Sequence, residues 1–139
     1  MTARLVPTPN YGTHEGLCPC GCGLGMADEL VICLQAFNSV LRRAWGVPIR
    51  HILTSGARCA AHNAKTPKAS PTSQHVHGLA VDGFYEMQRS GRWERIDNAD
   101  VAMAAVKSGI FGGVGYREYA RDGRNIVHLD IRQGPCLTW

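Results

Sequence analysis

Residues 27–45 read ADELVICLQAFNSVLRRAW, and this stretch is the strongest indicator of the fold. Apolar residues recur there at spacings of three and four, which places them on one face of a helix. They are Leu30, Leu34, Phe37, Val40, Leu41 and Trp45. Gly46 can cap the helix, and Pro48 prevents its continuation. The sequence therefore predicts a helix over residues 27–45.

Shorter elements follow this helix along the chain. A second helix is predicted over residues 98–108, with Asn98 as its cap and Gly109 at its end. Alternating or β-branched stretches predict strands over 49–54, 79–85, 113–119 and 125–131. The last two strands are predicted to form a hairpin through Asp122-Gly123. Residues 62–74 are predicted to be a polar loop, and residues 86–96 a loop or hairpin tip around Ser90-Gly91.

These elements predict one α+β domain over residues 1–139, with two main helices packed on a small, largely antiparallel sheet. Residues 1–25 are rich in Cys, Gly and Pro and are predicted to form an irregular N-terminal arm. A chain of 139 residues fits one hydrophobic core, and its composition of 45% apolar and 19% charged residues is ordinary for a globular protein.

The net charge of +4 is spread along the chain. It favours an acidic partner, although a solvated basic surface is an equally simple reading. We expect no nucleic-acid partner, because the Lys and Arg residues form no dense run. We expect no membrane insertion, because no apolar stretch approaches the roughly 18 residues that a spanning helix needs. The N-terminal residues MTARLVPTPNYGTHEG contain no signal-peptide core, so we expect synthesis in the cytosol. We also expect a monomer.

Three of the six cysteines, Cys18, Cys20 and Cys22, form a CxCxC cluster. Clustered cysteines in a reducing compartment are more often thiols or metal ligands than disulfides. The cluster lacks the CxxC spacing of common structural zinc sites. We therefore prefer free thiols in a tight turn over a second, structural metal. A cysteine-based redox or metal-storage protein would rest on this cluster alone.

Two segments carry residues suited to catalysis by a metal. The first is SQHVHGLAVD, residues 73–82, and the second is VHLDI, residues 127–131. A catalytic zinc ion takes three protein ligands, which can be imidazole nitrogen and carboxylate oxygen, and keeps one open position. If the two strands are neighbours, His75, Asp82 and His128 can converge. Each of these residues alone has an ordinary structural explanation, and only their joint occurrence favours a metal site.

The pattern SxHxxGxAxD, followed by HxD and preceded by SGxR, resembles the M15 peptidases, which include D-Ala-D-Ala carboxypeptidases and dipeptidases and L-alanyl-D-glutamate endolysins. Ser73, His75, Gly78, Ala80 and Asp82 match the first motif, and Ser55, Gly56 and Arg58 match the last. The similarity extends from about Cys18 to Arg132 and is greatest to short phage and prophage members. It implies zinc ligands His75, Asp82 and His128. It also implies that Arg58 stabilises charge on the scissile carbonyl or holds a substrate carboxylate.

One position departs from this family pattern. Many members have a carboxylate as general base three residues before the last histidine ligand, and this chain has Asn125 there. We predict Asp130 as the base, and the alternative is that Asp130 only orients His128. Asp122 is a weaker candidate. The base can also be absent, which would leave a site that binds zinc without turnover.

Further residues can contribute to a cleft. Strand alternation would place His77 on the face of His75, and we expect it on the substrate side or at the surface. Ser73 and Tyr116, together with Arg58 and His77, are predicted to bind substrate. Tyr116 and Trp139 can line the cleft or pack in the core.

The resemblance implies a zinc-dependent peptidase that cleaves an amide bond in the peptidoglycan stem peptide. The role would be that of a phage endolysin, a virion-associated wall hydrolase or a D,D-carboxypeptidase. Such an enzyme would act at the wall or in the periplasm after holin-dependent release or from the virion. The alternative from another class is a non-catalytic, zinc-containing module that binds the wall or forms part of a virion, and Asn125 favours it.

Overall fold

The computed structural model describes residues 9–12 and 14–139, so the predicted arm is described only in part. The helices are α1 (Asp28–Trp45), α2 (Ala60–Lys65), the 3-10 helix η1 (Gln74–His77), α3 (Asn98–Ser108) and α4 (Arg117–Arg121). The strands are β1 (Ile49–Ser55), β2 (Ala80–Arg89), β3 (Arg92–Arg95), β4 (Gly113–Gly115), β5 (Val127–Asp130) and β6 (Leu137–Thr138). Among the described residues, no helix is long and apolar enough to cross a membrane.

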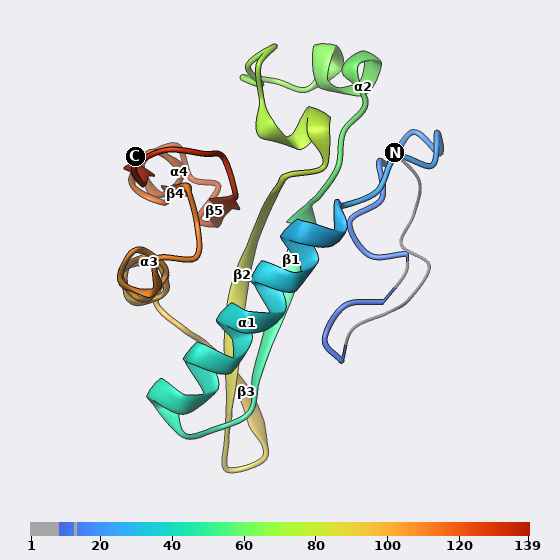
Figure 1. Ribbon diagram of the computed structural model, residues 1–139. Coiled ribbons are helices and arrows are strands. Elements are labelled where there is room, and N and C mark those ends of the chain that lie inside the picture. Colours follow the sequence, from blue (N-terminus) through green and yellow to red (C-terminus); the bar gives the residue numbers. More distant parts are fainter. Residues whose placement is uncertain (1–8, 13) are drawn as a thin grey trace.

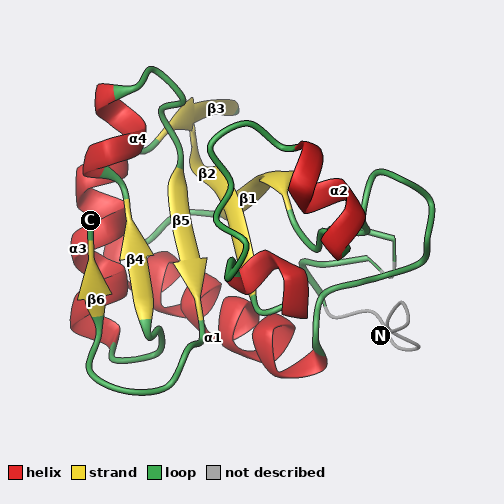
Figure 2. Ribbon diagram, turned by 90° about the horizontal axis from the view of Figure 1, so that it is seen from above, coloured by secondary structure: helices red, strands yellow, loops and turns green. Residues whose placement is uncertain are grey.

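The strands form one sheet in the order β1-β2-β5-β4-β6, with β3 paired to β2 (Figure 2). All pairs are antiparallel except β4 with β6, which is parallel. Helix α1 runs along β1 and β2 (Figure 1). The two longest helices, α1 and α3, share one apolar core with the sheet. The predicted α+β domain with a largely antiparallel sheet is confirmed.

Alternation along the central strands separates the core from the candidate site. Val81 of β2 and Val127 and Leu129 of β5 are fully buried in the core shared with α1 and α3. Asp82 and His128 are their immediate neighbours along the strands, so they point to the opposite face. This face carries the polar residues that the sequence analysis singled out.

Helix α1 was predicted within one residue, and Gly46 ends it in the left-handed conformation with φ 66°. Helix α3 has the predicted bounds and ends at Gly109, but its cap differs. The side chain of Asp97 accepts a hydrogen bond from the backbone N–H of Ala99, which makes Asp97 the cap. Asn98 is instead buried and donates from its side chain to Asn125. The prediction of Asn98 as the cap was therefore wrong.

The hairpin tip predicted around Ser90-Gly91 is present, because β2 continues to Arg89 and β3 pairs with it across this turn. Another local prediction was wrong. The predicted strand over 113–119 ends at Gly115, and the chain then forms α4 before it returns as β5. The predicted tight hairpin at Asp122-Gly123 is therefore the end of a short helix, although β4 and β5 do pair as antiparallel neighbours.

Candidate metal centre

Asp82 and His128 lie directly opposite each other on the paired strands β2 and β5. The Asp82 Oδ1 atom is 2.8 Å from the His128 Nδ1 atom. Ser55, the last residue of β1, pairs with Asp82 from the other side. Three neighbouring strands thus bring the SGxR segment, Asp82 and His128 to one place in the sheet.

His75 reaches the same place from the 3-10 helix η1, and local hydrogen bonds fix its position. The Ser73 hydroxyl accepts a hydrogen bond from the backbone N–H of His75, at 3.2 Å. Gly78 ends η1 at φ 68°, a conformation that suits glycine, and turns the chain into β2. Residues 74–77 form a 3-10 helix and not a strand, so strand alternation does not place His77 on the face of His75 as predicted. His77 is exposed at the end of η1.

The protonation of the His75 ring follows from its neighbour. The His75 Nδ1 atom is 2.6 Å from the carbonyl oxygen of Gly56. Because a carbonyl only accepts hydrogen bonds, Nδ1 must carry the proton. The Nε2 atom then faces Asp82, whose Oδ2 is 3.3 Å away. A metal-binding histidine held by a backbone carbonyl through its other nitrogen has this arrangement.

His75, Asp82 and His128 together form a donor set that fits zinc. One ligand atom from each lies within 4.8 Å of the others. His75 and His128 are buried, and Asp82 keeps 13% of its side-chain exposure. Two imidazoles and one carboxylate are a common catalytic zinc set, and three protein ligands leave a position open. When bound, zinc would polarise a substrate carbonyl and activate water.

Asp130 lies behind His128 with both oxygens occupied. Its Oδ2 is 2.8 Å from His128 Nε2, and its Oδ1 accepts hydrogen bonds from the backbone N–H and the Nε–H of Arg132. The side chain is completely buried. A β-carbon on Gly113 would lie 2.4 Å from Asp130 Oδ2, so only glycine leaves room for this carboxylate. These contacts favour the orienting role of Asp130 over the role of general base.

The charges at the centre stabilise one another. Burial alone would raise the pKa of Asp82, but hydrogen bonds with His128 and His75 hold this pKa well below its usual range. Burial opposes protonation of His128, yet Asp130 and Asp82 together raise its pKa above the ordinary value. Burial also acts against the charge of Asp130, whose pKa is nevertheless held low by His128 and Arg132. The two carboxylates are therefore ionised at neutral pH.

Arg58 follows the end of β1 and lies beside this centre. Its backbone N–H donates to the carbonyl of His75 at 3.0 Å. The side chain is half-buried, and its Nε atom is inaccessible to solvent without a hydrogen-bond partner among the described residues. Burial lowers the pKa of Arg58, while the charge of Asp82 opposes this shift. A guanidinium remains protonated in proteins. Arg58 thus offers a positive charge and an unused donor next to the candidate ligands.

Two other positions were considered for the general base, residues 125 and 122, and both side chains are bound by partners outside this centre. Asn125 has φ 53°, and its side-chain oxygen accepts a hydrogen bond from Asn98. Asp122 lies at the end of α4, where Arg124 binds its carboxylate and lowers its pKa. The two carboxylates considered as the base, Asp122 and Asp130, are therefore both bound by an arginine.

Aromatic residues from the C-terminal part of the chain surround His128. The Tyr119 ring is nearly parallel to the His128 ring, with centroids 6.2 Å apart, and the Trp139 ring lies 5.1 Å from it. Tyr116, which was predicted to bind substrate, lines a different hollow together with Met103 and Val106 of α3. Tyr119 was not predicted at this place, because residues 113–119 alternate like a strand and no motif marks this tyrosine.

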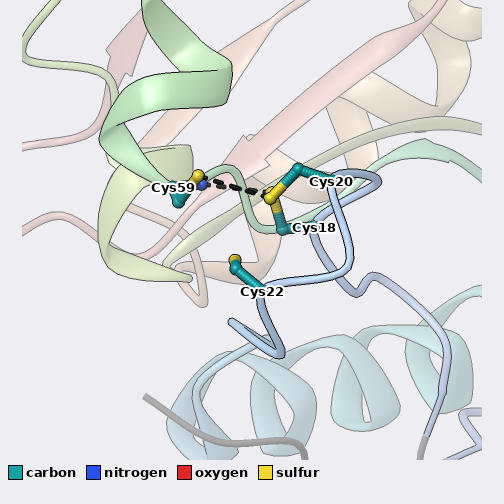
Figure 3. A group of neighbouring side chains, drawn as sticks. All are labelled: Cys18, Cys20, Cys22 and Cys59. Atoms are coloured by element: carbon teal, nitrogen blue, oxygen red, sulfur yellow. Dashed lines mark hydrogen bonds between the residues drawn. The ribbon is translucent and has the colours of Figure 1, made fainter.

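The predicted cysteine cluster gains a fourth member in the structure. Cys59, the residue after Arg58, lies beside Cys18, Cys20 and Cys22 (Figure 3). The cysteines are separate from the centre formed by His75, Asp82 and His128.

Comparison with known proteins agrees with this arrangement. The family model described as Peptidase M15 matches residues 13–130, which include both segments of the candidate centre and Arg58. No curated protein and no solved structure gave a significant match. The matched residues make up most of the chain, and they carry a buried His-Asp-His set with the donor chemistry of a metallopeptidase. The chain therefore belongs to the M15 family of peptidases.

Proposed function

We propose that the protein is a zinc-dependent peptidase that hydrolyses an amide bond in the peptidoglycan stem peptide. The observation that carries the proposal is the convergence of His75, Asp82 and His128 within 4.8 Å, with Arg58 nearby, whose Nε atom has no hydrogen-bond partner in the described part of the chain. Membership of the M15 family supports both the metal and the substrate class. The endolysin, virion-associated and D,D-carboxypeptidase roles all fit this chemistry.

Different residues of the chain would have different roles in such a reaction. Asp82 and the two histidines would hold the metal, while Gly56 and Asp130 fix the rings of His75 and His128 through their second nitrogens. Arg58 would donate to the carbonyl oxygen as negative charge develops there, or bind a carboxylate of the wall peptide. The ring of Trp139 beside His128 would help to exclude water from the bound peptide.

A second function is favoured by one specific observation. Asp130 is buried and fully hydrogen-bonded, and Asn125 is turned towards Asn98, so neither of these two positions supplies a free carboxylate base. A non-catalytic, zinc-containing module that binds wall peptide would need no such base. The retained charge of Arg58 fits both functions.

Digestion of purified peptidoglycan separates the two functions. Zinc-loaded protein is incubated with walls of several chemotypes, and released fragments are identified by mass spectrometry. We expect new peptide termini from the wild type and none from His128→Ala. The exposed residue His14 lies outside the candidate centre, so His14→Ala is the matched control and should digest normally. Binding of walls without any released fragment would contradict the peptidase and support the binding module.

A further inference from the structure

Four cysteines from two segments that are distant in the sequence lie together, three of them in the N-terminal arm (residues 1–25) and one before α2. Cys18, Cys20 and Cys22 lie on one loop and face Cys59, which precedes α2 (Figure 3). The Cys18 and Cys20 Sγ atoms are 3.3 Å apart, and those of Cys20 and Cys59 are 3.6 Å apart. All four Sγ atoms lie within 4.8 Å of one another.

These distances fit a shared metal ion better than disulfides. A disulfide brings two sulfur atoms to about 2.05 Å. Four thiolates around one zinc ion, each at about 2.3 Å in a tetrahedron, are about 3.8 Å apart. The Cys18–Cys20 and Cys20–Cys59 separations lie just below this value, and all four sulfur atoms are within 4.8 Å of one another. An all-thiolate tetrahedral set selects zinc or iron–sulfur centres among biological metals.

Backbone N–H groups around the cysteines donate hydrogen bonds to their sulfur atoms. The N–H of Cys59 donates to Cys18 Sγ at 3.3 Å, and the N–H of His62 donates to Cys59 Sγ at 3.4 Å. Such donors stabilise thiolates, which are the form that binds metal. Gly21, between Cys20 and Cys22, and Gly23, after Cys22, have positive φ angles of 81° and 87°, a conformation that glycine adopts readily in tight turns.

The loop also lies against the candidate metal centre. The N–H of Ala57 donates to the carbonyl of Gly16 at 2.8 Å, and a β-carbon on Gly56 would lie 2.4 Å from the Gly16 α-carbon. Gly56 in turn accepts the hydrogen bond from His75 Nδ1. Residues 56–59 therefore connect the cysteine cluster at one end with a ligand of the candidate centre at the other.

We propose that Cys18, Cys20, Cys22 and Cys59 bind one zinc ion as a structural site. This site fastens the N-terminal arm to residues 56–59 and so steadies the backbone that holds His75 and Arg58. It is a second metal site in the chain, and it does not depend on catalysis at the first.

Metal counting on purified, zinc-loaded protein tests the proposal. We expect two zinc ions per chain in the wild type. Cys59→Ser should lose one, and His128→Ala should lose the other. Cys33→Ser is the matched control, because Cys33 lies in α1 outside both groups, and it should keep two. One zinc ion per wild-type chain, unchanged by Cys59→Ser, would overturn the proposal, as would iron or copper in place of zinc at the cysteines.

Alkylation of the unaltered protein gives a test that does not depend on a variant folding. Cys20, Cys22 and Cys136 are all exposed, but only the first two belong to the cluster. In zinc-loaded protein we expect iodoacetamide to modify Cys136 while Cys20 and Cys22 are protected, and a chelator should remove this protection. Equal modification of the three residues before chelation would overturn the proposal. A disulfide within the cluster, seen as a loss of two hydrogens in the intact mass, would do the same.

These outcomes are independent of the proposed peptidase. A protein that binds two zinc ions but digests no wall would retain the cysteine site and contradict only the proposed function. A protein that digests walls, binds one zinc ion and has reactive Cys20 and Cys22 would support the proposed function and contradict the cysteine site.

Discussion

At the scale of single residues, the hydrogen-bond partners of a carboxylate determine what it can do. Asp82 and Asp130 both contact His128, at Nδ1 and Nε2 respectively. Asp82 keeps some exposure and lies in the donor set, whereas Asp130 is fully buried and bound by Arg132. A carboxylate behind a metal-binding histidine fixes the orientation of its ring and raises its basicity as a ligand.

Replacement of Asp130 by asparagine tests this role. If Asp130 orients His128, Asp130→Asn should weaken zinc binding at the His-Asp-His centre by about 10- to 100-fold. If Asp130 is the general base, zinc affinity should be retained and only the rate of hydrolysis should fall. Zinc affinity is measured by competition with a chelator, and hydrolysis by the release of wall peptides.

The control for this experiment is Asp122→Asn. Asp122 binds Arg124 two positions away, as Asp130 binds Arg132, but it lies outside the metal-binding group. Its replacement should leave zinc affinity unchanged. Loss of hydrolysis in Asp122→Asn with full zinc binding would identify Asp122, the weaker candidate, as the base.

His51 gives the folded protein a pH-dependent stability. Its ring stacks on Tyr85, with centroids 4.0 Å apart, and its Nε2 atom is inaccessible to solvent. Burial lowers the pKa of His51 to about 3. An unfolded histidine has a pKa of about 6.5, so below this pH the unfolded chain binds a proton that the folded chain excludes. The contribution of His51 to stability is therefore complete above pH 6.5 and is lost as the pH falls towards 3.

We expect the free energy of unfolding to decrease by up to about 1.4 kcal/mol per pH unit through this group. His51→Phe keeps an aromatic ring on Tyr85 without a titratable group, so the loss between pH 7 and pH 5 should be smaller than in the wild type. Urea unfolding at the two pH values measures the difference. His14→Phe, at an exposed histidine, should behave like the wild type. The same pH dependence in His51→Phe and the wild type would contradict this prediction.

At the scale of elements, α1 shows how far periodicity determines structure. Its apolar face packs Phe37 edge-on against Tyr85 of β2 and Phe111, with ring centroids 5.7 and 5.2 Å apart. Ile32 is on the same helix, but 64% of it is exposed. The spacing of apolar residues was enough to predict the helix and most of its buried face. Val40 and Trp45 are only partly buried, and Val31 and Asn38 are buried although they were not predicted.

We expect Phe37→Ala to lower the free energy of unfolding by about 3–5 kcal/mol, because it removes a buried aromatic side chain and leaves a cavity. Ile32→Ala should change it by about 0.5 kcal/mol or less, since the side chain is at the surface. Urea unfolding of both variants measures the contrast. Similar losses in both would show that the packing of α1 is not the main source of its stability.

The elements that could not be predicted are those whose ends depend on tertiary contacts. Residues 117–121 form α4 although the sequence GYREY alternates like a strand, and the backbone N–H groups of Tyr116 and Arg117 donate to Trp139 far along the chain. The cap of α3 was misplaced by one residue because Asn98 is used in a long-range hydrogen bond to Asn125. Local propensity contains no information about such partners.

At the scale of the whole molecule, bound metal should stabilise the fold. A ligand that binds only the folded state adds about 2.7 kcal/mol when its free concentration is 100 times its Kd. We therefore expect removal of zinc by a chelator to lower Tm by several degrees, and zinc to restore it. Thermal unfolding followed by circular dichroism measures the shift. His75→Ala should show a smaller shift than the wild type, and an unchanged shift would contradict metal binding at His75.

The candidate ligands could be predicted from the sequence because the motif spacing marks all three. Asp82 and His128 meet because they pair across neighbouring strands, and His75 joins them from η1. Cys59 could not be grouped with the CxCxC cluster, because it lies 39 positions after Cys20 and no spacing rule connects them. Their meeting depends on the contact between Gly16 and residues 56–57, which is a property of the folded chain.

The pairing of Asp82 with His128 limits where the chain can change in length. Side chains alternate between the faces of a sheet, so one residue inserted between Ala80 and Asp82 would turn the ligand Asp82 into the apolar core. One residue inserted between His128 and Asp130 would separate the His128 ring from the carboxylate that orients it. Insertions at the Ser90-Gly91 turn leave the pairing intact. Deletions and insertions tolerated by this fold should therefore accumulate at that turn and at the loop after α4, while β2 and β5 keep a fixed length.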